Sequence, residues 1–291
     1  MRRLEPEAVV QMREAVSRFL NDISEFVNSE GIVRTSNSQA ASEESSFQEA
    51  EAVHTVQSQG ATLVEVAGDH TGALVKMLQV PIETIAPWSA GRAVLEASAL
   101  ATWLLDPSID VRTRVGRSLS FRYEGLYQQV KFLRSVGSAD VKKAQERIDL
   151  VEQEAVNMGF RPVRDGRDRR NGIGQQMPSI TDLVRLMLHE ESLYRLASAV
   201  THAHFWALRH LSFRLVTSQQ PQLPGEQRAM QKGAAPDGIA LLLFSVVQAF
   251  ARALWFQCLY YGWNRDHLSG VLDGVHDRLG AREQVRFWKS K

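Results

Sequence analysis

Residues 88–105, WSAGRAVLEASALATWLL, decide the fold. As a helix, this stretch has apolar side chains around almost its whole circumference, and Arg92 and Glu96 are its only charged residues. A helix that is apolar on nearly every side has to be surrounded by other elements. Pro87 stands before the stretch and Asp106-Pro107 follows it, and prolines at these places favour helix boundaries. The stretch therefore predicts a central, buried helix over 88–105.

A second apolar stretch, residues 238–263, is long enough to cross a bilayer. Gln248, Arg252 and Gln257 interrupt it, and no companion stretch of this kind occurs in the chain. Polar and charged groups inside a membrane are costly. We therefore expect a buried bundle helix here and no membrane partner.

Further segments place apolar residues at helical intervals. They are residues 6–29, 47–79, 109–136, 140–157, 181–189, 194–210 and 265–280. The segment 47–79 is expected to break or bend near Gly60. Because strand-like alternation with hairpin turns is missing, the sequence predicts an all-α fold, a multi-helix bundle of about eight helices with long polar loops.

The composition suggests how this bundle is divided. We expect residues 1–33 to form an N-terminal helix. Residues 34–46 are rich in Ser, Asn, Ala and Glu without an apolar period, which predicts a flexible linker. Residues 47–291 then form the helical bundle domain, and a chain of 291 residues that is 44% hydrophobic is long enough to bury a substantial core.

The cysteine content limits the chemistry. Cys258 is the single cysteine, so neither an intrachain disulfide nor a cysteine-based zinc site can form, and a reducing cytoplasm fits. The N-terminal segment is amphipathic and regularly charged, which argues against a secretory signal. Sequence motifs for a zinc protease, a nucleophile elbow, a phosphate-binding loop and a dinucleotide-binding turn are all missing. We expect no cofactor and no metal.

The charge is unevenly distributed along the chain, although the net charge is only +1. Residues 1–60 hold five basic and ten acidic residues, whereas residues 108–170 hold fourteen and nine. The arginines of 109–136, among them Arg112, Arg114, Arg117 and Arg122, are expected on a charged outer face. The segment 160–179 is predicted to be a pliable loop. Its five arginines suit bidentate contacts to an RNA backbone, and a solvated, charge-balanced loop without an RNA partner is an equal alternative. The five are Arg161, Arg164, Arg167, Arg169 and Arg170.

Residues 194–210, YRLASAVTHAHFWALRH, carry the candidate chemistry. On one continuous helix, Arg195, His202 and Arg209 recur every seven residues and share a face with Trp206. Arg195 and His202 then lie about 10 Å apart along the axis, close enough to hold one phosphate between them. An imidazole can move a proton near neutral pH, and a guanidinium can stabilise a charged phosphate oxygen. The alternative is that both residues are satisfied by partners at a packed surface.

Other polar residues can support this pair. Arg92 and Glu96 are spaced i, i+4 on the predicted central helix, so they are expected to pair with each other, to steer His202, or to bind a ligand. Ser198 and Arg209 lie on the same predicted helix as the pair.

The arginine, six intervening residues and histidine resemble the motif of the HEPN helical ribonucleases. The run 88–107 followed by 194–202 is also similar to abortive-infection-type helical proteins and to uncharacterised actinobacterial all-helical proteins. The resemblance implies a helical bundle, a homodimer and a metal-independent endoribonuclease of toxin or phage-defence type, with Arg195 and His202 as catalytic residues.

Two other functions fit the residues. One is a non-catalytic helical interaction or scaffold protein, in which exposed or packed tryptophans contact a protein partner. These tryptophans are Trp206, Trp255, Trp263 and Trp288. The other is a pocket for a small apolar ligand beside the 238–263 helix, with Arg92, Glu96 and His202 as its polar groups.

Overall fold

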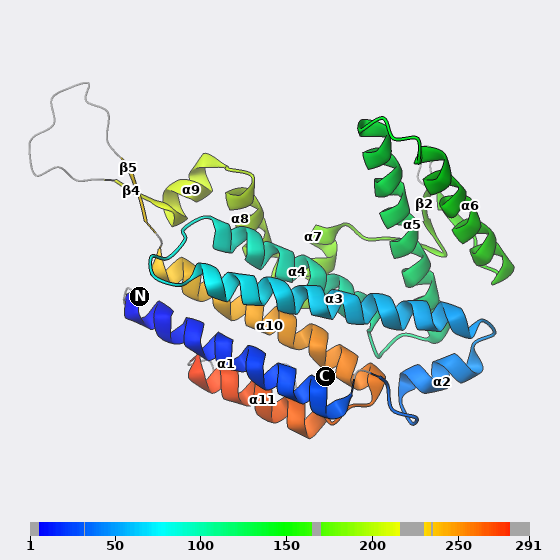
Figure 1. Ribbon diagram of the computed structural model, residues 1–291, viewed down its shortest axis with the longest axis horizontal. Helices are drawn as coiled ribbons and strands as arrows, with labels where there is room; N and C mark the ends of the chain where they lie inside the picture. Colours follow the sequence, from blue (N-terminus) through cyan, green and yellow to red (C-terminus); the bar gives the residue numbers. More distant parts are fainter. Residues whose placement is uncertain (1–5, 32, 165–169, 216–229, 234, 280–291) are drawn as a thin grey trace, which may run out of the picture.

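The computed structural model describes residues 6–31, 33–164, 170–215, 230–233 and 235–279. These residues form eleven α-helices, one π-helical turn and five short strands (Figure 1). The long helices are α1 (Pro6–Glu30), α3 (Ala50–Met77), α4 (Ala86–Leu104), α5 (Val111–Ser135), α6 (Val141–Asn157), α10 (Pro236–Tyr261) and α11 (Arg265–Arg278). The short ones are α2 (Gln39–Ser46), α7 (Ile180–Leu183), α8 (Glu191–Thr201) and α9 (Phe205–Leu211), and the π-helical turn η1 (Val184–Leu188) follows α7.

The all-α class is confirmed, and the expected number of about eight helices is too low. One additional helix is α2, which has eight residues and lies in the predicted linker, and another arises because the predicted 194–210 helix is divided into α8 and α9. A segment as short as α2 contains too few turns for a helical period to be recognised in the sequence. Tertiary contacts hold these segments helical, because an isolated helix of this size is marginal in water.

Helix α4 is the centre of the bundle, as the sequence predicts. It packs against α3, α8 and α10, and its residues Val94, Leu95 and Leu104 are fully buried. Figure 1 shows α3, α4 and α10 running side by side, with α1 and α11 on the far side of α10. The side chains of Val16, Phe19 and Phe26 on α1 belong to the same core, so the N-terminal helix packs into the bundle.

Two glycines allow these helices to approach closely. A Cβ added at Gly60 would lie 2.5 Å from the side chain of Leu105, and one at Gly91 would lie 2.6 Å from that of Leu242. The expected break at Gly60 is therefore wrong: α3 continues through it, and the glycine provides the space in which Leu105 packs.

Helix α10 is the second apolar stretch of the sequence. By length and composition it can cross a membrane, and 72% of its most apolar window lies buried inside the fold. Among its buried residues are Gln248 and Gln257, two of the polar residues that interrupt the stretch. The helix packs against α1, α3 and α4, as expected of a buried bundle helix.

A buried ion pair joins helix α2 to α5, in a region where two expectations from the sequence are wrong. Residues 39–46 form helix α2 in place of the flexible linker predicted over 34–46, and the Ser38 side chain caps the helix by accepting from the Ala41 N–H. Glu43 on α2 binds Arg114, whose Nε lies 3.0 Å from the carboxylate, and Arg114 has no exposed surface. The Tyr260 hydroxyl donates to the same carboxylate at 2.9 Å. Arg114 is thus a buried anchor and not part of a charged outer face.

Helices α5 and α6 form a hairpin with a smaller core of its own, which includes Val115, Ile148 and Val151. Three short antiparallel strands cover α5 where the sequence predicted only a loop. These strands are β1 (Pro162–Arg164), β2 (Arg170–Ile173) and β3 (Gln175–Gln176). The Ser120 hydroxyl fixes them to α5 by accepting from the Ile173 N–H at 3.1 Å. A second hairpin consists of β4 (Phe213–Leu215) and β5 (Met230–Lys232).

The buried pair gives a stability prediction. Arg114→Ala leaves the carboxylate of Glu43 buried without its cation, which costs roughly 3–5 kcal/mol of unfolding free energy. Guanidinium chloride unfolding followed by far-UV circular dichroism measures this loss. Arg134→Ala, at an exposed position of the same helix, is the control and should change stability by less than about 0.5 kcal/mol. Equal effects of the two substitutions would contradict an anchoring role for Arg114.

Candidate functional site

The helix is interrupted at residues 202–204, within the stretch that carries the candidate chemistry. Helix α8 ends at Thr201, and Ala203 adopts a left-handed conformation with φ of 56°. The N–H groups of Ala203 and His204 return to the carbonyls of Val200 and Ala199, which is the Schellman pattern of a helix end. The predicted continuous helix over 194–210 is therefore wrong. The sequence conceals the break because alanine is a strong helix former and is rare at this left-handed position.

The break separates residues that were expected to share one face. Arg209 lies on α9, exposed, and makes no hydrogen bond or ion pair with any residue that the structure describes. Arg195 is exposed on α8, where its Nε lies 2.8 Å from the Glu191 carboxylate. No interaction joins Arg195 to His202 among the described residues. Ser198 is half-buried, and its carbonyl accepts the His202 N–H at 2.9 Å.

His202 instead contacts the central helix. Nη1 of Arg92 lies 3.0 Å from Nε2 of His202, and Nε of Arg92 donates to Glu96 at 2.8 Å. The Tyr194 hydroxyl donates to the same oxygen of Glu96 at 3.0 Å, and the Arg92 guanidinium lies 5.6 Å from the centre of the Tyr194 ring. We call Arg92, Glu96, Tyr194 and His202 the α4–α8 cluster. The expected pairing of Arg92 with Glu96 is confirmed, and of these two residues only Arg92 contacts His202.

The hydrogen bonds determine the tautomer of His202. A guanidinium has no acceptor, so Nε2 must accept the bond from Arg92, and the proton of the neutral ring is then on Nδ1. Nδ1 has no partner among the residues that the structure describes, and the side chain is exposed. The imidazole therefore has one nitrogen oriented by the protein and the other open to a ligand.

Burial and charge shift the pKa values of two members of the cluster. Burial raises the pKa of the Tyr194 hydroxyl, and the neighbouring Glu96 carboxylate raises it further. Burial alone would lower the pKa of Arg92, but Glu96 and Tyr194 together raise it above its usual value. At neutral pH, Tyr194 is therefore a hydrogen-bond donor and Arg92 is a permanent cation.

Tyr194 is the member of the cluster that sequence reasoning missed. Its residue type does not distinguish it from a core tyrosine, and its ring is indeed buried. The signal available in the sequence was its place on the same helix as His202, eight residues earlier and therefore on a neighbouring face.

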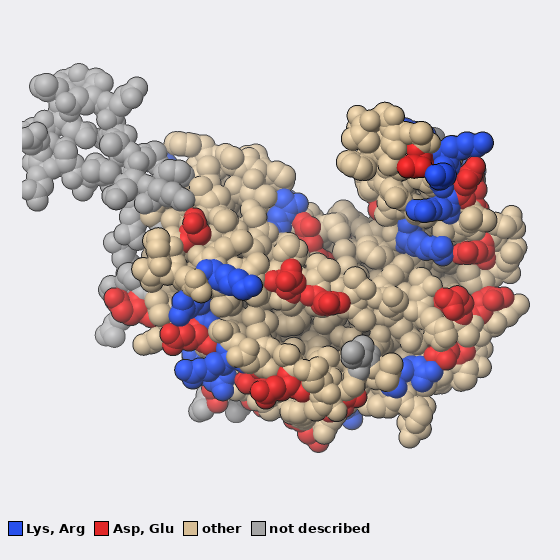
Figure 2. All heavy atoms as spheres, in the orientation of Figure 1, with Lys and Arg blue, Asp and Glu red and all other residues tan. Residues whose placement is uncertain are grey.

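The arginines of the 160–179 segment lie in another part of the fold. Arg161 is exposed just before β1, Arg164 is exposed at its end, and Arg170 begins β2. Arg167 and Arg169 lie outside the described residues. Together with Arg112, Arg161 lines a cavity of about 390 Å³ next to Phe160 and α5. Figure 2, in the orientation of Figure 1, shows a hollow in the surface between the part that holds α8 and the α5–α6 hairpin.

The chain matches no family model, no curated protein and no solved structure. In the part of the chain that the structure describes, no group of three or more His, Cys, Asp and Glu residues is placed to hold a metal ion. The chemistry open to this protein therefore follows from the geometry of the α4–α8 cluster.

The raised pKa of Tyr194 predicts a pH-dependent contribution to stability. Tyr194→Phe removes the bond to Glu96 and should cost about 1 kcal/mol of unfolding free energy at pH 7. Because the pKa is raised in the folded state, this contribution is full below the ordinary tyrosine value of about 10 and is lost as the pH rises through the folded value. Urea unfolding of both proteins at pH 7, 9 and 10.5 measures the difference. The control is Tyr127→Phe, at an exposed position of α5. If the difference in unfolding free energy between wild type and Tyr194→Phe were the same at pH 7, 9 and 10.5, this would argue against the assigned bond.

Proposed function

We propose that the α4–α8 cluster is the catalytic centre of a metal-independent endoribonuclease. The observation that carries the proposal is the 3.0 Å contact between Arg92 and His202, which joins a permanent cation to an exposed imidazole across two helices. Those two groups are what cleavage of RNA by its own 2′-hydroxyl requires: one to move a proton and one to stabilise charge on the phosphate.

Each residue has a defined part in this proposal. The phosphate binds to Arg92, since a charge-assisted bond to an anion is stronger than the bond to a neutral imidazole, and Nε2 of His202 is released. His202 takes the proton of the 2′-hydroxyl as its oxygen attacks phosphorus. The bond to the 5′-oxygen breaks, a 2′,3′-cyclic phosphate forms, and the leaving oxygen takes a proton from water or from the imidazolium. Glu96 and Tyr194 are positioning residues that hold Arg92.

Arg195, the arginine of the HEPN-like spacing, stays a second candidate for the phosphate contact. Its ion pair with Glu191 lies on an exposed helix face, where such pairs are weak and exchange readily. Arg161 and Arg164 would contact the RNA backbone away from the cluster. The resemblance to HEPN and abortive-infection proteins supports a toxin or phage-defence role in the cytoplasm, as a homodimer.

Cleavage of a 5′-labelled single-stranded RNA in the presence of EDTA tests the proposal. We expect cleavage with a cyclic phosphate end, and a loss of roughly 100-fold or more in rate for His202→Ala and for Arg92→Ala. Arg195→Ala decides whether the second arginine also takes part. His210→Ala, an exposed histidine on α9, is the matched control and should keep the wild-type rate. No cleavage by the wild type, or equal cleavage by wild type and His202→Ala, would refute it.

A second candidate function rests on the exposed aromatic residues next to the cluster. Phe205 is 67% and Trp206 is 55% exposed at the start of α9. Aromatic residues are enriched at protein interfaces, and large apolar side chains in contact with water favour association. We propose that this pair forms part of an interface with a second copy of the chain.

Sedimentation velocity tests the interface. The wild type should self-associate at micromolar concentration, and Phe205→Ser with Trp206→Ser should shift it to monomer. Phe132→Ser, which changes an aromatic residue of similar exposure on α5, is the control and should leave association unchanged. A wild type that stays monomeric up to several hundred micromolar would exclude this interface.

A further inference from the structure

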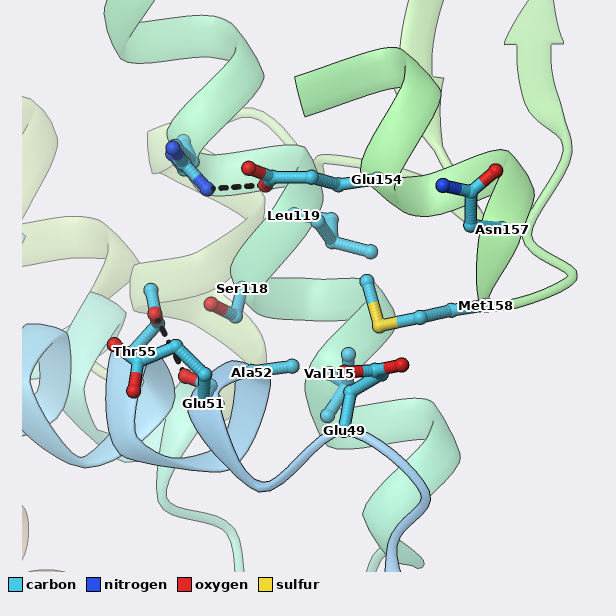
Figure 3. Close-up of a pocket in the computed structure, with 11 residues that line it drawn as sticks. Glu49, Glu51, Ala52, Thr55, Val115, Ser118, Leu119, Glu154, Asn157 and Met158 are labelled. Carbon is cyan, nitrogen blue, oxygen red and sulfur yellow. Dashed lines mark hydrogen bonds and ion pairs between the residues drawn. The ribbon is translucent and has the colours of Figure 1, made fainter. Parts of the chain in front are cut away.

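A separate cavity lies between α3, α5 and α6 and shares no residue with the α4–α8 cluster. Its volume is about 490 Å³, which is within the range of sites that hold small organic molecules. The first turns of α3, the N-terminal half of α5 and the C-terminal end of α6 form its walls (Figure 3).

The middle of the cavity is apolar. Ala52 from α3, Val115 and Leu119 from α5, and Met158 after α6 line it, and Figure 3 shows Leu119 and Met158 between Glu154 and Glu49. The hydroxyl of Ser118 is already engaged, because it donates to the side chain of Gln59 at 2.7 Å. This part of the cavity therefore suits the hydrocarbon or aromatic body of a ligand, for which a flexible methionine is an adaptable contact.

The edges of the cavity are acidic. Glu154 lies at one edge, and Glu49 and Glu51 lie at the opposite edge (Figure 3). Among the described residues that line the cavity, Arg122 is the only basic one, and it is paired with Glu154 at 2.8 Å. Glu51 has a long contact of 3.4 Å to His54, and Glu49 has no side-chain partner among the residues that the structure describes. Arg122 thus neutralises one edge, whereas the other edge carries two carboxylates, of which only Glu51 has a nearby cationic group, the His54 ring.

We propose that this cavity binds a small organic cation, an amine with an apolar body. The body packs on Ala52, Val115, Leu119 and Met158, and the ammonium group faces Glu49 and Glu51. The charge favours this occupant over an anion, because two carboxylates at the open edge repel a negative ligand. The site is independent of the proposed ribonuclease activity, and neither depends on the other.

Three indole compounds of similar size and different charge test the proposal. Tryptamine is the cationic probe, indole is neutral and indole-3-acetate is anionic. Isothermal titration calorimetry gives the affinities of the three compounds. The NMR resonance of the Met158 methyl group, assigned with the Met158→Leu variant, reports whether a compound enters this cavity. We expect tryptamine to shift that resonance and to bind at least about fivefold more tightly than indole-3-acetate.

Substitutions at the rim distinguish charge from shape. The Glu49 side chain makes no capping bond to α3, so Glu49→Gln together with Glu51→Gln preserves the helix start. This double variant should weaken tryptamine binding about two- to fivefold and leave indole unchanged. Ala52→Leu fills the cavity and should weaken tryptamine and indole alike. Glu65→Gln, an exposed position on the same helix, is the control. No shift of the Met158 methyl at millimolar tryptamine, or equal affinity for tryptamine and indole-3-acetate, overturns the proposal.

Discussion

The burial of α4 is the constraint on which the rest of the structure depends. A helix with apolar residues on nearly every side can be stable in this chain only if other elements cover its apolar faces, and α3, α8, α10, α7 and η1 pack against it. Burying its apolar surface is the main favourable contribution to the fold. Two glycines, Gly60 on α3 and Gly91 on α4 itself, let Leu105 and Leu242 pack where a Cβ would otherwise lie.

The same constraint explains the position of the α4–α8 cluster. Arg92 and Glu96 cannot be covered by apolar side chains at an acceptable cost in free energy, because a buried charge without a partner is strongly unfavourable. Tyr194 in the first turn of α8 and His202 just after its end complete their hydrogen bonds, and the imidazole is left exposed to solvent. The hydrogen bonds that satisfy Arg92 and Glu96 thus also hold His202 at the surface, in an arrangement suited to proton transfer.

Arg114 plays a comparable part at the other end of the bundle. Its side chain joins α2, α5 and α10 through Glu43 and the ring of Tyr260, which lies 4.4 Å from the guanidinium. It also donates to the carbonyl of Leu104, the last residue of α4, at 2.8 Å. The α5–α6 hairpin is therefore attached to the central helix by a buried charge as well as by apolar contact. The cavity beside this hairpin lies where α3, α5 and α6 meet.

The sequence by itself determined the all-α class, the buried helix at 88–105, the buried stretch at 238–263 and the pairing of Arg92 with Glu96. These features depend on helical periodicity and on i, i+4 spacing, which are local properties of the chain. Only the tertiary structure decided that α8 ends at Thr201, that Arg114 is buried and that His202 contacts Arg92. The left-handed Ala203, the carboxylate 71 positions away from Arg114 and the guanidinium 110 positions away from His202 are fixed by long-range packing, which no local pattern encodes.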